Sequence, residues 1–117
     1  MAWTVERSAE ADSDIELIFD FLFQAAMDFG EPAEQAFERA ARRIRAIDDA
    51  IFSLAVAPHQ GTPDAHLLPG LRHVSKERAI IYFDADEGAK ILRVLAVFFG
   101  GQDHQRRMLI RLLGGQS

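Results

Sequence analysis

Apolar residues recur along this chain at two different spacings, and the spacing changes near residue 60. Between residues 8 and 57 the apolar positions repeat every three or four residues. Between residues 71 and 99 they form short runs that are rich in β-branched and aromatic side chains. The first spacing is typical of amphipathic helices and the second of strands. Two helices followed by a small sheet are therefore expected.

Local signals set the expected ends of the two helices. Ser8 supplies an N-cap hydroxyl for the first helix, and Gly30 ends it. Pro32 suits the first position of the second helix, which Pro58 and Gly61 stop. The apolar stripes comprise Ile15, Ile18, Leu22, Ala25, Ala26 and Phe29 in the first helix, and Ala36, Phe37, Ala40, Ile44, Ile47, Ile51 and Leu54 in the second. The pair predicts an antiparallel helical hairpin.

Strands are expected on both sides of this hairpin. Residues 3–7 alternate apolar and polar positions, which predicts a brief strand with Trp3 and Val5 on its buried face. Residues 71–74, 79–83 and 90–99 predict three antiparallel strands joined by short turns, whereas residues 58–69 are turn-rich and predict a loop. The last strand is apolar on both faces apart from Arg93, which is typical of a central strand.

A short helix is expected to close the chain. Asp103 can cap it after Gly100 and Gly101. The spacing places Met108, Leu109 and Leu112 on its apolar side and leaves Arg106, Arg107 and Arg111 exposed. The fold class predicted for residues 1–117 is a single α+β domain. It has an N-terminal strand, an antiparallel helical hairpin packed on a small, mainly antiparallel sheet, and a short C-terminal helix.

Composition limits the chemistry of the chain. There is no cysteine, which excludes disulfides, thiolate nucleophiles and zinc sites that contain cysteine. The first residues do not have the pattern of a signal peptide, and no apolar run approaches the ~20 residues that span a bilayer. We therefore expect a cytoplasmic protein with no membrane partner.

Charge is distributed unevenly along the chain. Residues 1–40 hold ten acidic and two basic residues, or −8, and residues 41–117 hold eight acidic and eleven basic residues, or +3. The sum is the net charge of −5. Because proteins that grip nucleic acid by themselves are usually basic, this balance disfavours autonomous nucleic-acid binding.

The order of the elements and several short motifs resemble the RelE/ParE superfamily of bacterial toxins. The resemblance covers nearly the whole chain. Its most specific pieces are Trp3-Thr4-Val5 followed by Ser8-x-x-Ala11, Pro58-x-x-Gly61, Pro69-Gly70-Leu71-Arg72, the run from Arg78 to Phe83 and the run from Ile91 to Leu95. The pattern is similar to the ParE branch, whose members inhibit DNA gyrase, whereas the RelE branch cleaves mRNA in the ribosomal A site.

The ParE resemblance implies a toxin of a type II toxin–antitoxin module, of the kind that stabilises plasmids. It implies DNA gyrase and a cognate ParD-like antitoxin as partners, and a hetero-oligomer with the antitoxin. It implies no cofactor. His59, His66 and His73 lack the spacing of metal ligands, and they are interpreted as loop or surface histidines. No metal site is predicted.

Catalysis is not predicted for the ParE interpretation. Cleaving RNA without a metal needs a base, an acid and several cations around the phosphate, yet the only lysines are Lys76 and Lys90, both in expected turns. The alternative is a RelE-like ribosome-dependent endoribonuclease, with its catalytic residues drawn from Arg72, Tyr82, Arg93 and His104. A third possibility is a detoxified relative that persists as half of an autoregulatory complex.

Two sets of contact residues are predicted. Strand alternation places Arg72 with Val74 on one face, and Arg78 with Ile80 and Tyr82 on one face of the next strand; these arginines either meet a partner or pair with acidic helix residues. Candidates for antitoxin contact are two arginines and three phenylalanines off the main stripes, namely Phe19, Phe23, Phe52, Arg72 and Arg78. Candidates for target contact are Arg93, Arg106, Arg107, Met108, Leu109, Leu112 and Leu113.

Overall fold

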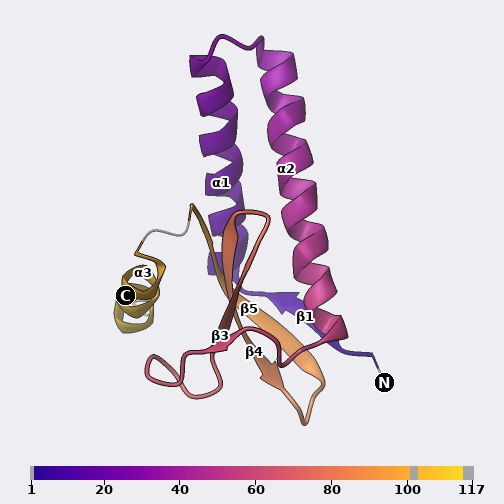
Figure 1. The fold of residues 1–117 in the computed structure, drawn as a ribbon, viewed down its shortest axis with the longest axis vertical. Coiled ribbons are helices and arrows are strands. Elements are labelled where there is room, and N and C mark those ends of the chain that lie inside the picture. The colour runs from indigo at the N-terminus through magenta and orange to yellow at the C-terminus, as the bar shows by residue number, and fades with distance from the viewer. Residues whose placement is uncertain (1, 101–102, 115–117) are drawn as a thin grey trace.

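The computed structural model describes residues 2–100 and 103–114, and it has the predicted α+β architecture (Figure 1). The predicted fold class is therefore confirmed. In chain order the elements are β1 (Thr4–Arg7), α1 (Ala9–Asp28), α2 (Ala33–Ser53), the 3₁₀ turn η1 (Leu54–Val56), β2 (Thr62–Pro63), β3 (Arg72–Lys76), β4 (Ala79–Asp86), β5 (Ile91–Phe99) and α3 (His104–Gly114).

The five strands form one sheet in the order β1-β5-β4-β3-β2. β1 runs parallel to β5, and the remaining neighbours are antiparallel. The N-terminal strand thus pairs with the last strand of the sheet and closes the fold from both ends of the sequence. β5 has neighbours on both sides, which confirms the central position predicted from its apolar faces.

Helices cover both faces of the sheet. The hairpin of α1 and α2 packs on one face and rises beyond it, while α3 lies against the other face (Figure 1). The core under the hairpin joins the two helical stripes to Ile81, Phe83, Leu92, Val94 and Val97. The core under α3 consists of Leu71, Ile80, Tyr82, Ala96, Phe98 and Met108.

A β-bulge at Leu95 lets β5 serve both cores. Two consecutive residues of β4 pair with Ala96 and Val94, so Leu95 is the extra residue. The bulge shifts the alternation by one, and therefore Val94 and Val97 both face the hairpin. The Leu95 carbonyl accepts a hydrogen bond from the hydroxyl of Ser8, 3.3 Å away. The predicted N-cap of α1 is thus also tied to the bulge.

Two predictions about local structure were wrong in detail. The segment expected to be a loop contains β2, whose two residues pair with Arg72 and His73. A two-residue strand has no alternation to detect, and only its partner defines it. Pro32 is the N-cap of α2, one position before the first helical residue, and the cap has no side-chain hydrogen bond.

Candidate functional site

An apolar groove lies between α1, the β3–β4 turn, the end of β5 and α3. It has a volume of about 400 Å³, and we call it the α1 groove. Leu17 and Phe21 form one wall and are 66% and 61% exposed. The ring of Phe99, at the end of β5, lies 6.3 Å from that of Phe21. The other lining residues are Asp14, Ile18, Arg78, Val97, Gly100 and Arg107. Large apolar side chains left open in this way mark surfaces that other molecules cover.

Two arginines border the α1 groove, and neither has an acidic partner among the described residues. Arg78 sits in the turn between β3 and β4, where it and Glu77 have positive φ angles of 64° and 53°. The prediction that Arg78 shares a strand face with Tyr82 was therefore wrong, because a turn residue lies outside the alternation. The guanidinium of Arg107 stacks over the ring of Phe98 at 4.4 Å. Both positive charges thus remain available to an acidic partner.

Phe19 and Phe23 do not form an open groove. Both are half-buried between α1 and α2, where their ring centroids lie 5.2 and 6.5 Å from that of Phe37. Phe52 is 69% exposed, at the far end of α2. Sequence reasoning missed Leu17 and Phe21, although their spacing of four residues outside the main stripe is the signal of a second apolar face.

A partly buried ion pair fixes α3 to the rest of the fold. Arg111 donates two hydrogen bonds to Asp14 of α1, at 2.7 and 2.8 Å. The backbone N–H of Val97 donates to the same carboxylate at 2.9 Å, and Asp14 is 6% exposed. The hydrogen bond to Asp14 raises the pKa of Arg111, against the opposing effect of burial. The prediction that Arg111 is exposed was wrong, because its partner is 97 residues away in the sequence.

The predicted target-contact residues divide into two groups. Met108 is 1% exposed and Leu112 is half-buried, so these two hold α3 on the sheet. Leu109 and Leu113 are 42% and 71% exposed, and Arg106 and Arg107 are exposed as well. Ile110, which sequence reasoning missed, is also exposed. α3 thus presents an apolar and basic outer side.

Arg93 lies on the sheet itself. In register it stands between Asp84 of β4 and Glu6 of β1. Burial raises the pKa of Asp84, and the positive charge of Arg93 partly offsets that effect. The acidic neighbours on both sides partly balance the charge of Arg93.

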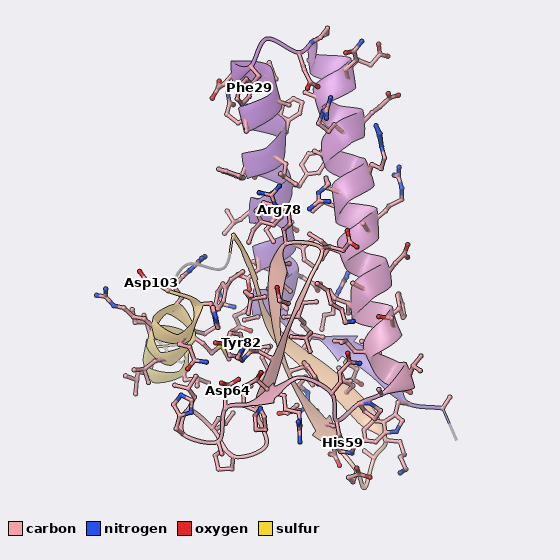
Figure 2. The ribbon with its side chains drawn as sticks, in the orientation of Figure 1. Phe29, His59, Asp64, Arg78, Tyr82 and Asp103 are labelled. Atoms are coloured by element: carbon pink, nitrogen blue, oxygen red, sulfur yellow. The ribbon has the colours of Figure 1, made fainter. Side chains whose placement is uncertain are left out.

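A polar network lies between the sheet and the first turn of α3. Tyr82 is fully buried, and burial raises the pKa of its phenol to about 12. The phenol oxygen and Nδ1 of His104 share a hydrogen bond of 2.7 Å. Nδ1 of His73 donates to the carboxylate of Asp64 at 2.6 Å. Asp64 is 1% exposed and also accepts from Gln105 of α3 at 2.8 Å. Figure 2 labels both Tyr82 and Asp64.

The two histidines of this network influence one another. Their ring centroids lie 4.9 Å apart. Burial lowers the pKa of His104, the nearby His73 lowers it further, and Asp64 acts in the opposite direction. The interpretation of His73 as a loop or surface histidine was wrong, since it lies on β3 with a buried carboxylate as its partner. Nothing in the sequence pattern links these positions.

The four residues of the endoribonuclease alternative are only partly brought together. Tyr82 and His104 are hydrogen-bonded. Arg72 shares the opposite face of β3 with Val74, as alternation predicted, and Arg93 lies beside Asp84. Within residues 2–100 and 103–114, no group of three or more histidine, aspartate or glutamate side chains is placed to hold a metal ion. No helix in the same ranges is long and apolar enough to span a membrane.

Comparison with known proteins places this fold among toxin–antitoxin structures. No protein-family model matches the chain, and no curated protein sequence does. Solved structures do match, and they have the RelE/ParE type of fold, which confirms at the level of the fold the resemblance seen in the sequence.

Two of these structures are described by their titles as toxin–antitoxin assemblies. One is the chromosomal ParDE TA system from P. aeruginosa, which is similar to this chain with a TM-score of 0.65 and 17% identity over 83% of this chain and 95% of that one. The other is the toxin–antitoxin complex RelBE2 from Mycobacterium tuberculosis, with a TM-score of 0.60 and 17% identity over 85% and 92%. Both branches of the superfamily are thus represented at the same identity.

Proposed function

We propose that this chain is the toxin of a type II toxin–antitoxin module of the ParE kind. It binds DNA gyrase and blocks the strand-passage cycle without catalysing a reaction, and a ParD-like antitoxin neutralises it in a hetero-oligomer. Such a target places the protein in the cytoplasm. The observation that carries the proposal is the exposed apolar surface of the α1 groove and α3, on a fold similar to chains of two toxin–antitoxin structures.

The α1 groove is the proposed antitoxin site. Its wall of Leu17, Phe21 and Phe99 would take the apolar side of an amphipathic helix or of an extended segment. Arg78 and Arg107 at its border would pair with carboxylates of the same segment. Because this chain is acidic overall, an apolar contact anchored by a few arginine–carboxylate pairs is the arrangement that avoids repulsion between the partners.

The remaining antitoxin candidates lie outside the α1 groove. Phe19 and Phe23 hold α1 against α2, so a charge at either position is expected to destabilise the hairpin before it affects a contact. Arg72 and the exposed Phe52 would extend the contact along the sheet and the far end of α2.

The outer side of α3 is the proposed gyrase site. It combines exposed leucines, Leu109 and Leu113, with Arg106 and Arg107, which is the mixture of apolar anchors and arginine common in protein interfaces. Met108 and Leu112 pack against the sheet and hold α3 in place. Arg93 would contribute a charge from the sheet.

Inhibition of gyrase supercoiling by the purified chain tests the target. Increasing amounts of the chain should reduce supercoiling by the cognate gyrase, and the variant Leu113→Glu should inhibit at least about tenfold less well, as interface anchors do. Phe52→Glu, which changes an equally exposed residue on α2, serves as the control. Full inhibition by Leu113→Glu would remove α3 as the contact, and no inhibition by the unmodified chain would reject gyrase as the target.

A pair of phenylalanines tests the antitoxin site. Phe21→Glu should weaken binding to the antitoxin encoded beside this chain by at least about tenfold, because it places a charge in an apolar contact. Phe29→Glu is the matched control, since Phe29 is 91% exposed at the tip of the hairpin (Figure 2). Isothermal titration calorimetry measures both. Equal losses in the two variants would contradict the groove assignment.

A second candidate function is a ribosome-dependent endoribonuclease. The hydrogen bond between Tyr82 and His104, beside the pair of His73 and Asp64, favours it because orienting partners of this kind are common around catalytic histidines. Toeprinting of translating ribosomes distinguishes the two functions. Codon-specific cuts in the A site that disappear in His104→Ala would establish the nuclease and reject the proposal above.

A further inference from the structure

The turn between β3 and β4 adopts a conformation that its two residues disfavour. Only Glu77 and Arg78 connect the two strands. Their φ angles are 53° and 64°, and a two-residue turn with positive φ at both positions is normally filled by asparagine, aspartate or glycine. Glutamate and arginine are disfavoured in this region because their Cβ atoms crowd the backbone. The turn is therefore strained at both positions.

Contacts from two other parts of the fold hold this turn. Arg43 of α2 donates from Nη2 to the Glu77 carbonyl at 3.0 Å, and its Nη1 lies 3.7 Å from the Glu77 carboxylate. From the other side, the N–H of Gly100, the residue after β5, donates to the Arg78 carbonyl at 3.1 Å. A strained backbone persists only where its surroundings fix it. Here α2 and the end of β5 fix the carbonyl groups of both turn residues.

The turn places Arg78 at the α1 groove. Arg78 lines the groove with Leu17 and Ile18 of α1, and Figure 2 labels it at the tip of the β3–β4 hairpin, beside α1. Among the described lining residues the one carboxylate is that of Asp14, which is 6% exposed and already binds Arg111. Within residues 2–100 and 103–114, Arg78 makes no ion pair. The strained turn thus holds an unpaired cation beside an apolar surface.

We infer that the strain is retained because it presents Arg78 to a carboxylate of the antitoxin, and that Arg43 is the residue that positions it. An asparagine followed by a glycine would relax the turn, but neither residue offers a cation. Arginine binds a carboxylate through two parallel hydrogen bonds, and this geometry is favoured when the backbone that carries the guanidinium is already held in place.

Arg43 acts on the contact through the backbone of the turn. Its hydrogen bond to the Glu77 carbonyl fixes the peptide group from which Arg78 projects, while its own guanidinium points to the turn and is not among the residues that line the groove. Arg43 is therefore a positioning residue, and Arg78 is the residue that touches the partner. This inference rests on the proposal that the α1 groove is the antitoxin site.

The variant Arg78→Gly separates strain from contact, because stability and affinity should change in opposite directions. Glycine adopts positive φ without crowding, so the midpoint of urea denaturation should rise above that of the unmodified chain. Binding to the antitoxin encoded beside this chain, measured by isothermal titration calorimetry, should weaken by at least about tenfold, because the carboxylate of the partner loses its cation. A residue that only supports the fold would lower stability and affinity together.

A double-mutant cycle tests the positioning role of Arg43. Arg43→Met should weaken antitoxin binding by about fivefold while Arg78 is present, and it should change nothing in the Arg78→Gly background, because a positioning residue acts only through the residue that it positions. Arg42→Met is the matched control and should bind as tightly as the unmodified chain, since Arg42 is exposed on the same helix and makes no ion pair with any described residue.

The outcomes distinguish this inference from the antitoxin site on which it rests. If Phe21→Glu weakens binding more than Phe29→Glu does, the groove assignment stands. The inference alone is then overturned by unchanged affinity in Arg78→Gly or Arg43→Met, by a lower urea midpoint in Arg78→Gly, or by an equal loss for Arg43→Met in both backgrounds. If Phe21→Glu binds as well as Phe29→Glu, the antitoxin site and the inference fail together.

Discussion

Replacing Arg111 by methionine isolates the contribution of the ion pair that fixes α3. Methionine keeps an apolar stem over the ring of Phe98, where the Arg111 guanidinium lies 5.2 Å from the centroid, and removes only the charge and its hydrogen bonds. The carboxylate of Asp14 then remains buried with a single described donor, the N–H of Val97. An uncompensated buried charge is the physical source of the expected loss.

The size of the loss follows from the burial of the two partners. Removing one member of a fully buried ion pair costs about 3–5 kcal/mol. The side chain of Arg111 is 26% exposed and that of Asp14 is 7% exposed. Water can therefore reach part of the vacated site, and we expect the free energy of unfolding to fall by about 2–3 kcal/mol. For a chain of 117 residues, this lowers the midpoint of thermal unfolding by roughly 6–15 °C.

Urea denaturation followed by circular dichroism measures the change, because urea does not screen the ion pair as guanidinium does. Arg106→Met is the matched control, since Arg106 is exposed on the same helix, and it should change stability by less than about 0.5 kcal/mol. The double variant Asp14→Asn/Arg111→Met should be more stable than Arg111→Met alone, because no charge is left buried and the amide oxygen of asparagine can still accept from the N–H of Val97. A loss for Arg111→Met as small as that of the control would refute the reasoning.

Three other predictions concern the sheet and the caps. Tyr82 is the only tyrosine, and burial raises its pKa to about 12, so its absorbance should titrate near pH 12 in the folded chain and near pH 10 in the unfolded chain. The stability that this difference contributes is complete below pH 10 and is lost as the pH rises from 10 to 12. A folded-state midpoint near pH 10 would contradict the burial of Tyr82. Gly61→Ala should lower the free energy of unfolding in urea by at least about 2 kcal/mol, because the added Cβ would meet the backbone of β3 at 2.5 Å. Gly70 has a similar positive φ but open space around it, so Gly70→Ala should lower the same free energy by about 1 kcal/mol. Equal losses would show that the close approach at Gly61 has no effect. Ser8→Ala should lower the free energy of unfolding by about 1 kcal/mol, because α1 loses its N-cap hydrogen bond. Ser13→Ala, on the exposed side of the same helix, is the control and should leave that free energy unchanged. An unchanged urea midpoint for Ser8→Ala would show that the cap does not stabilise the fold.

Local patterns predicted the helices and the longer strands, but not the two-residue β2. The apolar repeat identified the stripe of α1 from Ile15 to Ala26, but its last predicted member, Phe29, is the C-cap of the helix and is 91% exposed. The hydroxyl of Ser8 does accept from the backbone N–H of Ala11 at 3.0 Å. Strand alternation also placed Arg72 and Val74 on one face. These signals depend on neighbours three or four positions apart, and such neighbours remain together whatever the rest of the chain does.

Strand ends were predicted less well. β4 extends to Asp86, three residues beyond the predicted end at Phe83. The additional residues include two aspartates, which the sequence pattern assigned to a turn. They pair with β5 all the same, because the backbone ladder accepts polar residues where the side chains reach solvent.

The candidate sites could not be predicted from local sequence patterns. The α1 groove depends on the packing that leaves Leu17 and Phe21 uncovered while Phe19 and Phe23 turn inward toward Phe37. A repeat of apolar residues shows that several faces of a helix are apolar, but it does not show which of them another element will cover. The antitoxin-contact prediction was therefore made for neighbouring phenylalanines of the same helix.

The sequence by itself determined the α+β fold, the helical hairpin, the central position of β5 and the absence of cysteine chemistry, since periodicity and composition carry this information locally. Only the tertiary structure brought Arg111 to Asp14, His73 to Asp64 and Tyr82 to His104. These pairs are separated by 97, 9 and 22 positions and follow no common period. Their contacts arise from the register of β3, β4 and β5 and from the docking of α3, because a buried charge or phenol gains its partner only when distant segments pack together.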